Sequence, residues 1–251
     1  MKNTNDFVGI DDHLRTFMIT HLNHRGKLLN QQEFPKTTEA ITTFLDTLSP
    51  GTHLALEATG HWMWFADLVG QRPLHLHLAH PYRVRAIAAA RIKTDKIDSS
   101  ILAHLLRTDL LPEAYLAPPP VRSLRELLRH RMHLVSYGTS LKNRIRALLA
   151  REGRLCPYVD LNGKKAKAWL LTQPWQPSAR TAVTGYLQVL DQLTDTLRER
   201  ELQLRNHAAS TPQAQLLMTM PGIGYFSALL VLAEIGQINR FPSAKQLCSY
   251  A

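Results

Sequence analysis

Residues 7–12 read Phe-Val-Gly-Ile-Asp-Asp, a short apolar run that ends at two carboxylates. A run of this length, stopped by polar residues, is typical of a buried strand. Thr16–Leu22 predicts a second strand, and Thr52–Leu56 predicts another that ends at Glu57. Leu74–Leu78 alternates with a period of two, as strands do. The first hundred-odd residues therefore predict a mixed α/β domain.

Helical patterns fill the intervals between these strands. The apolar positions of Thr37–Leu48 recur at helical spacing, and His61–Val69 reads as an aromatic-rich helix. Ala86–Leu106 has a helical composition that is interrupted near residues 93–95. Lys27–Leu29 follows a turn signal and predicts a further short strand.

The second half of the chain is of a different kind. Pro118–Pro120 marks a boundary, because proline runs cannot continue a helix and act as stiff spacers. Beyond it, Val121–Arg151 predicts one long helix. Two sets of apolar residues recur every seven positions: Leu127, Leu134, Leu141 and Leu148, then Val183, Leu190, Leu197 and Leu204. These stripes suit either a dimerising coiled coil or two helices of an ordinary bundle.

A last segment begins at Pro212. It runs through Met-Pro-Gly-Ile-Gly at residues 220–224 into a strongly apolar helix at Phe226–Ile235. We therefore expect three domains: an α/β domain at 1–117, a basic helical or coiled-coil region at 118–211, and a helical domain at 212–251. Because nothing at residues 249–251 resembles a finished terminus, we expect the last domain to be partial and the chain to be truncated.

The composition excludes several classes of protein. Of the 251 residues, 45% are hydrophobic and 20% are charged, which is ordinary for a globular protein and excludes wholesale disorder or collagen. The two cysteines form no CxxC pair, so a disulfide scaffold is excluded and a reduced, cytoplasmic setting is expected. No run of about 18 apolar residues predicts a membrane span, and the polar start lacks a signal peptide.

Positive charge is concentrated in one part of the chain. The formal net charge is +10. Residues 121–167 contribute 12 basic and only three acidic side chains to this balance. A clustered positive field of this size is typical of a polyanion binder. The alternative is a solvated helix face.

Four carboxylates could form one site. Asp11 and Glu57 end two predicted strands, whereas Asp95 and Asp98 share one face at the start of a predicted helix. Hard oxygen ligands suit Mg²⁺ or Mn²⁺. Two such ions about 4 Å apart can assist displacement at a phosphodiester. Taken alone, Asp95 and Asp98 would also suit a helix N-cap with an acidic first turn, and Asp12 could exchange roles with Asp11.

The order of these motifs resembles the IS110/IS1111 transposases. The resemblance rests on Gly-Ile-Asp at 9–11, Leu-Glu-Ala-Thr-Gly-His-Trp at 56–62 and Lys-Thr-Asp-Lys-Ile-Asp at 93–98. It continues through residues 220–224, 233–236 and 240–243. It implies an RNase H-like (RuvC-like) N-terminal domain whose DEDD tetrad maps onto Asp11, Glu57, Asp95 and Asp98, followed by a coiled coil and a transposase domain.

The resemblance also implies partners and an activity. Family members recombine DNA, are guided by a structured RNA, and assemble as homo-oligomers, either dimers or tetramers. Their metal site and a serine nucleophile act together across protomers. That serine lies beyond the block ending at residue 251, so neither Ser243 nor Ser249 is assigned as the nucleophile. We therefore expect a DNA transposase of IS110 type that is incomplete for strand exchange.

Candidate nucleic-acid contacts lie in three places. Arg91, Lys93 and Lys96 flank the acidic residues, and Lys142, Arg144 and Arg146 belong to the basic helix. Gly222 and Gly224 belong to a turn of helix-hairpin-helix type, whose amides could bind a phosphate. The alternative for the turn is a tight connection that needs small residues. The His75 and His77 pair could suggest zinc, but further ligands are not evident and structural histidines are the favoured interpretation.

Two other functions would use the same residues. A metal-dependent nuclease of Holliday-junction-resolvase type would use water as the nucleophile in place of serine. A non-catalytic nucleic-acid-binding remnant would bind in a salt-sensitive way without cleaving DNA. A covalent protein–DNA adduct would distinguish the recombinase from the nuclease.

Overall fold

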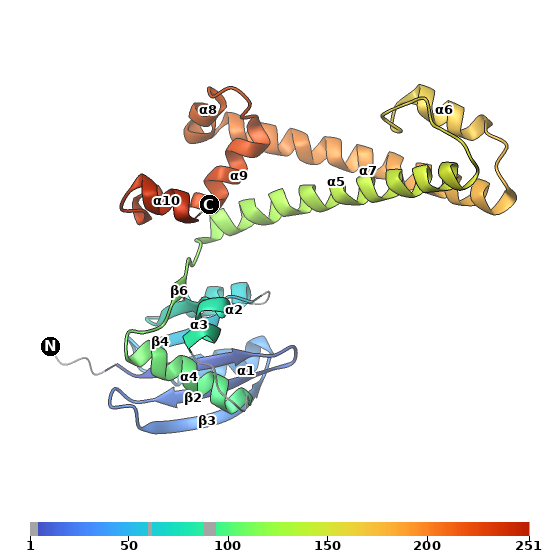
Figure 1. Cartoon of the computed structure of the whole chain (residues 1–251). Coiled ribbons are helices and arrows are strands. Elements are labelled where there is room, and N and C mark those ends of the chain that lie inside the picture. The colour runs from blue at the N-terminus through green and yellow to red at the C-terminus, as the bar shows by residue number, and fades with distance from the viewer. Residues whose placement is uncertain (1–4, 60–61, 88–93, 251) are drawn as a thin grey trace. The chain divides into compact units, whose positions relative to one another are not determined.

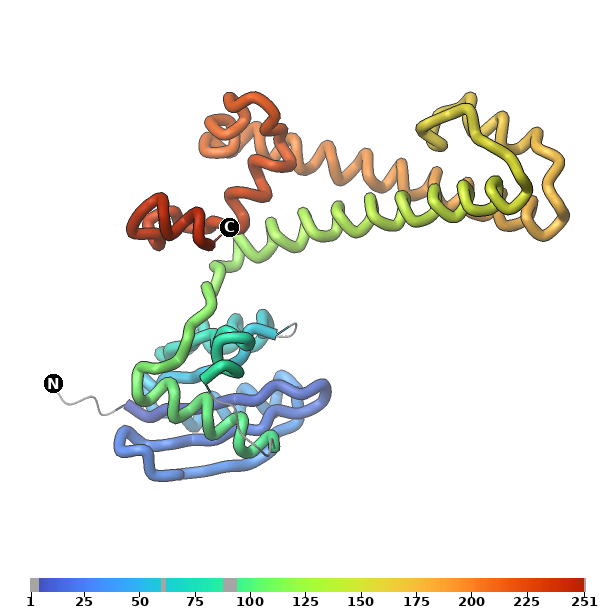
Figure 2. The backbone as a smooth tube through the Cα atoms, in the orientation of Figure 1, coloured from blue at the N-terminus to red at the C-terminus, as the bar shows by residue number. Residues whose placement is uncertain are grey.

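The computed structural model describes residues 5–59, 62–87 and 94–250. The chain divides into two compact units, Met1–Leu116 and Ala117–Ala251, and we treat each by itself (Figures 1 and 2). The predictions for Gly60, His61, Arg91 and Lys93 fall outside the described residues. Among the helices of the described part, none combines the length and apolar character needed to cross a membrane.

The first unit is built on a six-stranded mixed sheet in the order β3-β2-β1-β4-β5-β6. The strands are β1 (Phe7–Asp12), β2 (Thr16–Leu22), β3 (Leu28–Pro35), β4 (His53–Glu57), β5 (His75–Ala79) and β6 (Glu113–Ala114). Strand β1 lies at the centre, antiparallel to β2 and parallel to β4. The two strands that the sequence predicts to end in carboxylates are therefore direct neighbours.

Helices cover both faces of this sheet. The helices are α1 (Thr38–Asp46), α2 (Trp62–Val69), α3 (Pro81–Ile87) and α4 (Asp95–Arg107). Val8 and Ile10 of β1 pack with Ile41 of α1 and Phe65 of α2 on one face. On the other face, residues of β1, β4 and β5 pack with Val84 of α3 and with α4. Because side chains alternate along a strand, Asp11 lies on the α4 face.

The predicted elements differ from the structure mainly at edges. Strand β3 reaches Pro35 and is longer than the predicted Lys27–Leu29. Its pattern is hidden because most of this edge strand is exposed, so burial imposes no alternation. Helix α6 (Lys164–Thr172) lies between the two apolar stripes, within the region predicted to be helical. Pro119 and Pro120 also begin a helix instead of preceding one, which the first helical turn tolerates.

The second unit is helical. Its helices are α5 (Pro119–Arg151), α6, α7 (Pro177–Ala209), α8 (Pro212–Met218), α9 (Tyr225–Ile235), the 3₁₀ turn η1 (Ile238–Arg240) and α10 (Ala244–Tyr250). Helices α5 and α7 lie side by side (Figure 1). They run antiparallel, because Gly138 faces Leu190 while Arg131 pairs with Glu201.

The two apolar stripes meet within the chain. Ile145 and Leu149 of α5 pack with Val183 and Leu190 of α7, and Leu128 packs near Leu204 at the other end of the pair. Three residues of the α7 stripe, Val183, Leu190 and Leu204, are buried in this intramolecular pair. In α5 only Leu134 of the predicted stripe is buried, and the other buried leucines and isoleucine lie one residue beyond or between the predicted positions. Helices α8 and α9 share the core at the Leu128 end. The sequence-based boundary at residue 212 stays a prediction.

Candidate metal centre

The close approach of α4 to β1 places the candidate acidic residues. Gly9 provides this approach, because an added Cβ would lie 2.0 Å from the Ser99 carbonyl oxygen and 2.5 Å from the Ala103 nitrogen. Only glycine leaves room for backbone this near. Two residues further along the strand, on the same face, lies Asp11. The first turn of α4 is thereby brought to the end of β1.

A polar network fixes the start of α4 against the sheet. The buried hydroxyls of Thr20 and Ser99 lie 2.8 Å apart. The Gln31 amide donates to Thr20 Oγ1 at 2.8 Å and to the Lys96 carbonyl at 2.9 Å. The N-cap is Thr94, whose hydroxyl accepts from the Ile97 amide. Asp95 is therefore not the cap, whereas Asp95 and Asp98 do form the acidic first turn that the same interpretation expects. The Asp95 carboxylate is thus available for other contacts.

Asp11, His13 and Asp95 form one cluster of potential metal ligands. Each offers one atom, and these atoms all lie within 4.8 Å of one another. His13 Nε2 lies 3.0 Å from Asp11 Oδ2 and 3.2 Å from Asp95 Oδ1. The Asp11 side chain is 17% exposed, the Asp95 side chain 59%. Two carboxylates and an imidazole are a donor set that suits a divalent cation.

The electrostatics of Asp11 support such a site. Burial raises the pKa of the Asp11 carboxyl above its ordinary value of 3.8, and the charges of Asp98 and Asp95 raise it further. His13 opposes these effects. The negative charge of Asp11 is thus disfavoured by burial and by the neighbouring carboxylates. A bound cation would offset both costs.

The two remaining residues of the predicted tetrad lie on the elements that carry this cluster or pair with them. Asp98 is half-buried in the first turn of α4 and close enough to influence Asp11. Glu57 is half-buried and ends β4 one position beyond Leu56, the register partner of Ile10. Asp11 and Glu57 therefore end neighbouring parallel strands on the same face. Neither Asp98 nor Glu57 belongs to the 4.8 Å group found among the described residues.

His13 is the cluster member that sequence reasoning missed. The feature of the sequence that could have indicated His13 is its position two residues after Asp11, because alternate residues of an extended chain share a face. Asp12, by contrast, does not exchange roles with Asp11. It lies on the opposite face, where its buried carboxylate is paired with Lys36 and accepts a hydrogen bond from Thr59 at 3.3 Å.

The candidate nucleic-acid contacts have different environments. Lys96 and Arg144 are exposed. Lys142 is paired with Asp160 at 3.3 Å, and Arg146 donates to the Val159 carbonyl at 2.7 Å. Lys142, half-buried and paired with a carboxylate, contributes less to a free positive surface than its sequence position suggests, whereas Arg146 is exposed and keeps its charge at the surface.

Several other basic residues of the 121–167 stretch also have partners inside the unit. Arg131 lies over the Phe226 ring, 4.6 Å from its centroid, and Arg125 donates to the Ala233 carbonyl at 2.8 Å. Lys167 is paired with Asp191. Counting charges along the sequence therefore overstates how much positive charge faces solvent.

The two glycines of the 220–224 turn are not equivalent. Gly222 has φ = +88°, a left-handed conformation that favours glycine. Gly224 is the N-cap of α9 with φ = −91°, and an added Cβ would meet nothing within 4 Å. The turn therefore explains Gly222, whereas Gly224 has no steric need to be glycine. A phosphate contact by the Gly224 region stays a prediction.

The histidines of β5 have structural partners, as the favoured interpretation expects. His53 Nδ1 and His77 Nε2 lie 2.9 Å apart, and His77 Nδ1 lies 2.7 Å from Glu113 Oε1. The rings of His53 and His75 stack with centroids 4.9 Å apart. Burial lowers the pKa of His53 below 6.5, and the neighbouring His77 and His75 lower it further.

This stack predicts an acid-sensitive fold. Below about pH 6.5 the unfolded chain protonates His53, whereas the folded protein resists protonation until a lower pH. The free energy of unfolding should therefore fall as the pH drops below 6.5. Urea unfolding at pH 7.5 and 5.5 should give a smaller loss for His53→Gln than for the wild type. The exposed His24 provides the control. If His24→Gln reduced the loss of unfolding free energy between pH 7.5 and 5.5 as much as His53→Gln does, His53 would not be the source of the acid sensitivity.

Comparison with known proteins identifies the class of this chain as transposase. Residues 8–152 match the DEDD transposase family of IS110, described as "Transposase". Residues 214–251 match the family described as "Transposase IS116/IS110/IS902 family". The first match covers more than half of the chain. This protein therefore belongs to the IS110 family of transposases.

Curated relatives agree along most of the chain. It is 26% identical over 245 residues to the transposase for insertion sequence element IS1328 of Yersinia enterocolitica, covering 95% of the chain and 70% of that relative. It is 22% identical over 249 residues to the transposase for IS1111A of Coxiella burnetii, covering 97% and 66%. It is 27% identical over 259 residues to the pilin gene-inverting protein of Moraxella lacunata, covering 98% and 70%.

Proposed function

We propose that this chain acts on DNA as an IS110-type transposase, using the acidic cluster of its first unit in strand cleavage and exchange. The observation that carries the proposal is the grouping of Asp11, His13 and Asp95 within 4.8 Å. The sheet order is compatible with an RNase H-like (RuvC-like) fold. The named relatives, two transposases and a gene-inverting protein, support the same activity.

Asp11, Glu57, Asp95 and Asp98 would hold two Mg²⁺ or Mn²⁺ ions. Bound divalent cations activate an attacking oxygen and stabilise the leaving oxygen of a phosphodiester. Asp11 would bind from β1 and Asp95 from α4, while the network around Ser99 keeps the two elements in place. His13 would orient the two carboxylates through its contacts at 3.0 and 3.2 Å. Exposed Lys96, one residue from Asp95, would attract the DNA phosphate.

The partners in this proposal are DNA, a structured guide RNA and further copies of the chain in a dimer or tetramer. The net charge of +10 supports polyanion binding. Arg144 of the long helix and the amides at Gly222 and Gly224 remain candidate backbone contacts. Since the chain spans 66–70% of the relatives compared above, their complete reaction is proposed for this chain by family membership.

Metal binding tests the proposal directly. Titration of the full chain with Mn²⁺, followed by electron paramagnetic resonance, should give binding that Asp95→Asn weakens by at least about tenfold, since loss of an outer-shell partner alone costs that much. Asp195→Asn, at an exposed carboxylate of α7, is the matched control and should leave binding unchanged. Equal affinities for wild type and Asp95→Asn would contradict the site.

A denaturing gel separates the recombinase from the nuclease. Incubation with Mg²⁺ and radiolabelled DNA of the insertion-sequence ends should give a protein-linked band if a protein nucleophile attacks. Metal-dependent cleavage without that band would favour hydrolysis by water in this chain, whereas the band itself would require a nucleophile within residues 1–251, where neither Ser243 nor Ser249 is assigned that role.

A further inference from the structure

The loop at residues 152–163, which joins α5 to α6, carries an unusual surface. We call this loop the tip. It lies at one end of the α5–α7 pair, beside α6 (Figures 1 and 2). Leu155 and Val159 are each 91% exposed, more than any other large hydrophobic side chain of the described residues. Two branched apolar side chains are thus presented to solvent from one short loop.

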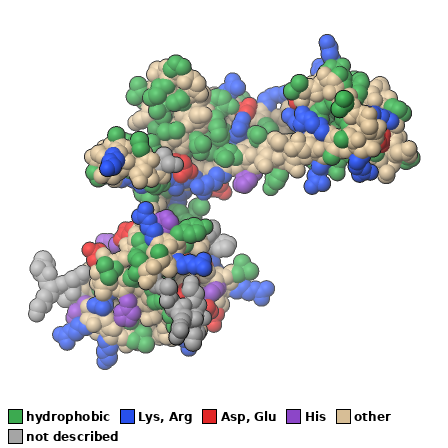
Figure 3. Space-filling view, in the orientation of Figure 1, with side chains coloured by type: hydrophobic (Ala, Val, Ile, Leu, Met, Phe, Trp, Pro, Cys, Tyr) green, Lys and Arg blue, Asp and Glu red, His purple; other side chains and the backbone are tan. Residues whose placement is uncertain are grey.

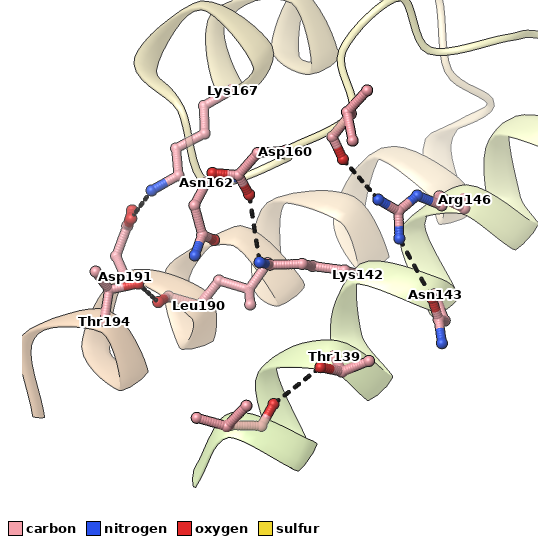
Figure 4. Close-up of polar contacts among 12 residues, drawn as sticks. Thr139, Lys142, Asn143, Arg146, Asp160, Asn162, Lys167, Leu190, Asp191 and Thr194 are labelled. Atoms are coloured by element: carbon pink, nitrogen blue, oxygen red, sulfur yellow. Dashed lines mark hydrogen bonds and ion pairs between the residues drawn. The ribbon is translucent and has the colours of Figure 1, made fainter. Parts of the chain in front are cut away.

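The tip is anchored on both sides of Val159 (Figure 4). Arg146 of α5 donates to the Val159 carbonyl at 2.7 Å, and Lys142 donates to Asp160 Oδ1 at 3.3 Å. The Asn162 amide donates to the same carboxylate oxygen at 3.0 Å, and this bond lowers the pKa of Asp160. Leu161 is fully buried in the core between α5, α6 and α7.

The residues on either side of Leu155 fix its backbone in place. Arg154 donates to the Pro174 carbonyl at 2.7 Å and lies over the Trp175 ring, 5.5 Å from its centroid. Its guanidinium also pairs with Glu152 at 3.2 Å. On the following side, Cys156 packs partly buried against the core. Both exposed side chains therefore project from fixed backbone, which lowers the entropic cost of inserting them into a partner.

Positive charge surrounds the two apolar side chains. Four exposed basic residues flank the tip: Arg144 and Arg151 near the end of α5, and Lys164 and Lys165 at the start of α6. The two acidic residues of the tip, Glu152 and Asp160, are already paired. Figure 3 shows basic and hydrophobic side chains gathered together over this end of the helix pair. Lysines at a helix N-terminus are repelled by the positive end of the helix dipole. A bound phosphate would offset this repulsion.

From this combination we infer that the tip binds duplex DNA, with Leu155 and Val159 entering the minor groove and partly unstacking a base step. Apolar wedges of this kind kink DNA by about 20–90°. Single strands are bound mainly by stacking on aromatic rings, and Tyr158 is instead half-buried against Trp169. A second copy of the same basic surface would be repelled. The inference rests on the proposed action on DNA and adds a DNA-bending contact to it.

The test measures DNA affinity and bending together in the full chain. A duplex of insertion-sequence end DNA, labelled at both ends, reports bending by energy transfer. The double variant Leu155→Ala/Val159→Ala should bind about tenfold more weakly, because both side chains lose their burial on binding, and should no longer bend the duplex. The matched control is Leu202→Ala/Val189→Ala, at exposed apolar positions of α7. It should leave affinity and bend unchanged.

The flanking charges give an independent readout. Lys164→Ala/Lys165→Ala should reduce the slope of log K against log salt by about two, since each phosphate contact contributes about 0.9. The result that overturns the inference is a wild-type affinity and bend in the tip variant. The inference is also overturned if the tip variant loses affinity only for an A-form RNA duplex of the same sequence. It is overturned likewise if the variant changes only the oligomeric state of the protein. If the wild type binds no DNA, the proposed function fails, and this inference fails with it.

Discussion

Asp11→Asn is expected to weaken metal binding severely while making the metal-free protein more stable at neutral pH. Asparagine keeps the shape of the side chain but removes the charge that a cation needs. Loss of this ligand should weaken Mn²⁺ binding on the order of 100-fold, since even outer-shell partners of a metal cost about 10–100-fold. Metal-dependent DNA cleavage should fall below detection. The effect exceeds that of Asp95→Asn because Asp11 is the more buried of the two carboxylates.

The gain in stability follows from the direction of the pKa shift. Burial, with Asp98 and Asp95, raises the pKa of Asp11, so ionising it costs more in the folded state than in the unfolded chain. The wild type should therefore lose stability as the pH rises from about 3.8 through the raised pKa. The variant lacks this loss. Thermal unfolding with excess chelator, from pH 4 to 7, measures the difference between the two proteins.

Added metal should make the wild type more stable than Asp11→Asn, the reverse of the order expected in chelator. Excess Mn²⁺ should raise the unfolding temperature of the wild type, because a ligand that binds only the folded state stabilises it. Asp11→Asn should not respond. A variant that is less stable than wild type in chelator, or that still responds fully to Mn²⁺, would remove Asp11 from the metal site.

Strand and helix positions could be predicted where burial imposes a pattern. The central strand, its neighbour ending at Glu57 and the long helices α5 and α7 follow directly from apolar runs or regular spacing. Strand β3 could not be bounded, since its exposed polar residues carry no alternation. Strand β6 has two residues and exists through its pairing with β5, which is a tertiary contact without a local signal.

Two carboxylates of the observed cluster, Asp11 and Asp95, were among the residues predicted from the sequence, whereas His13 was not. Carboxylates at strand ends are visible in a sequence because they interrupt apolar runs. His13 follows the strand, and it can contact both carboxylates only because α4 places Asp95 beside it, which the folded chain alone determines. For the same reason, sequence spacing could not reveal that Lys142 and Arg146 donate hydrogen bonds to the tip.

Gly9→Ala is expected to destabilise the first unit strongly, although it adds only one methyl group. The added Cβ would meet backbone atoms of α4 at 2.0 and 2.5 Å, and backbone cannot rotate away as a side chain can. Helix α4 must shift or β1 must distort. Overpacking of this kind costs about 1–3 kcal/mol, and contact with two backbone atoms places this variant at the upper end of that range or beyond it. Urea unfolding of the full chain measures the loss.

Gly185→Ala is the matched control, because an added Cβ meets nothing within 4 Å in the interior of α7. It should be neutral or stabilise the protein by about 0.5–1 kcal/mol, since alanine favours a helix more than glycine does. Gly9→Ala should also lose Mn²⁺ binding, because displacing α4 carries Asp95 away from Asp11. It would thus lose fold and metal together, whereas Asp11→Asn loses the metal alone. A Gly9→Ala protein with wild-type stability would mean that α4 does not lie on β1, and the acidic cluster would then have no physical basis.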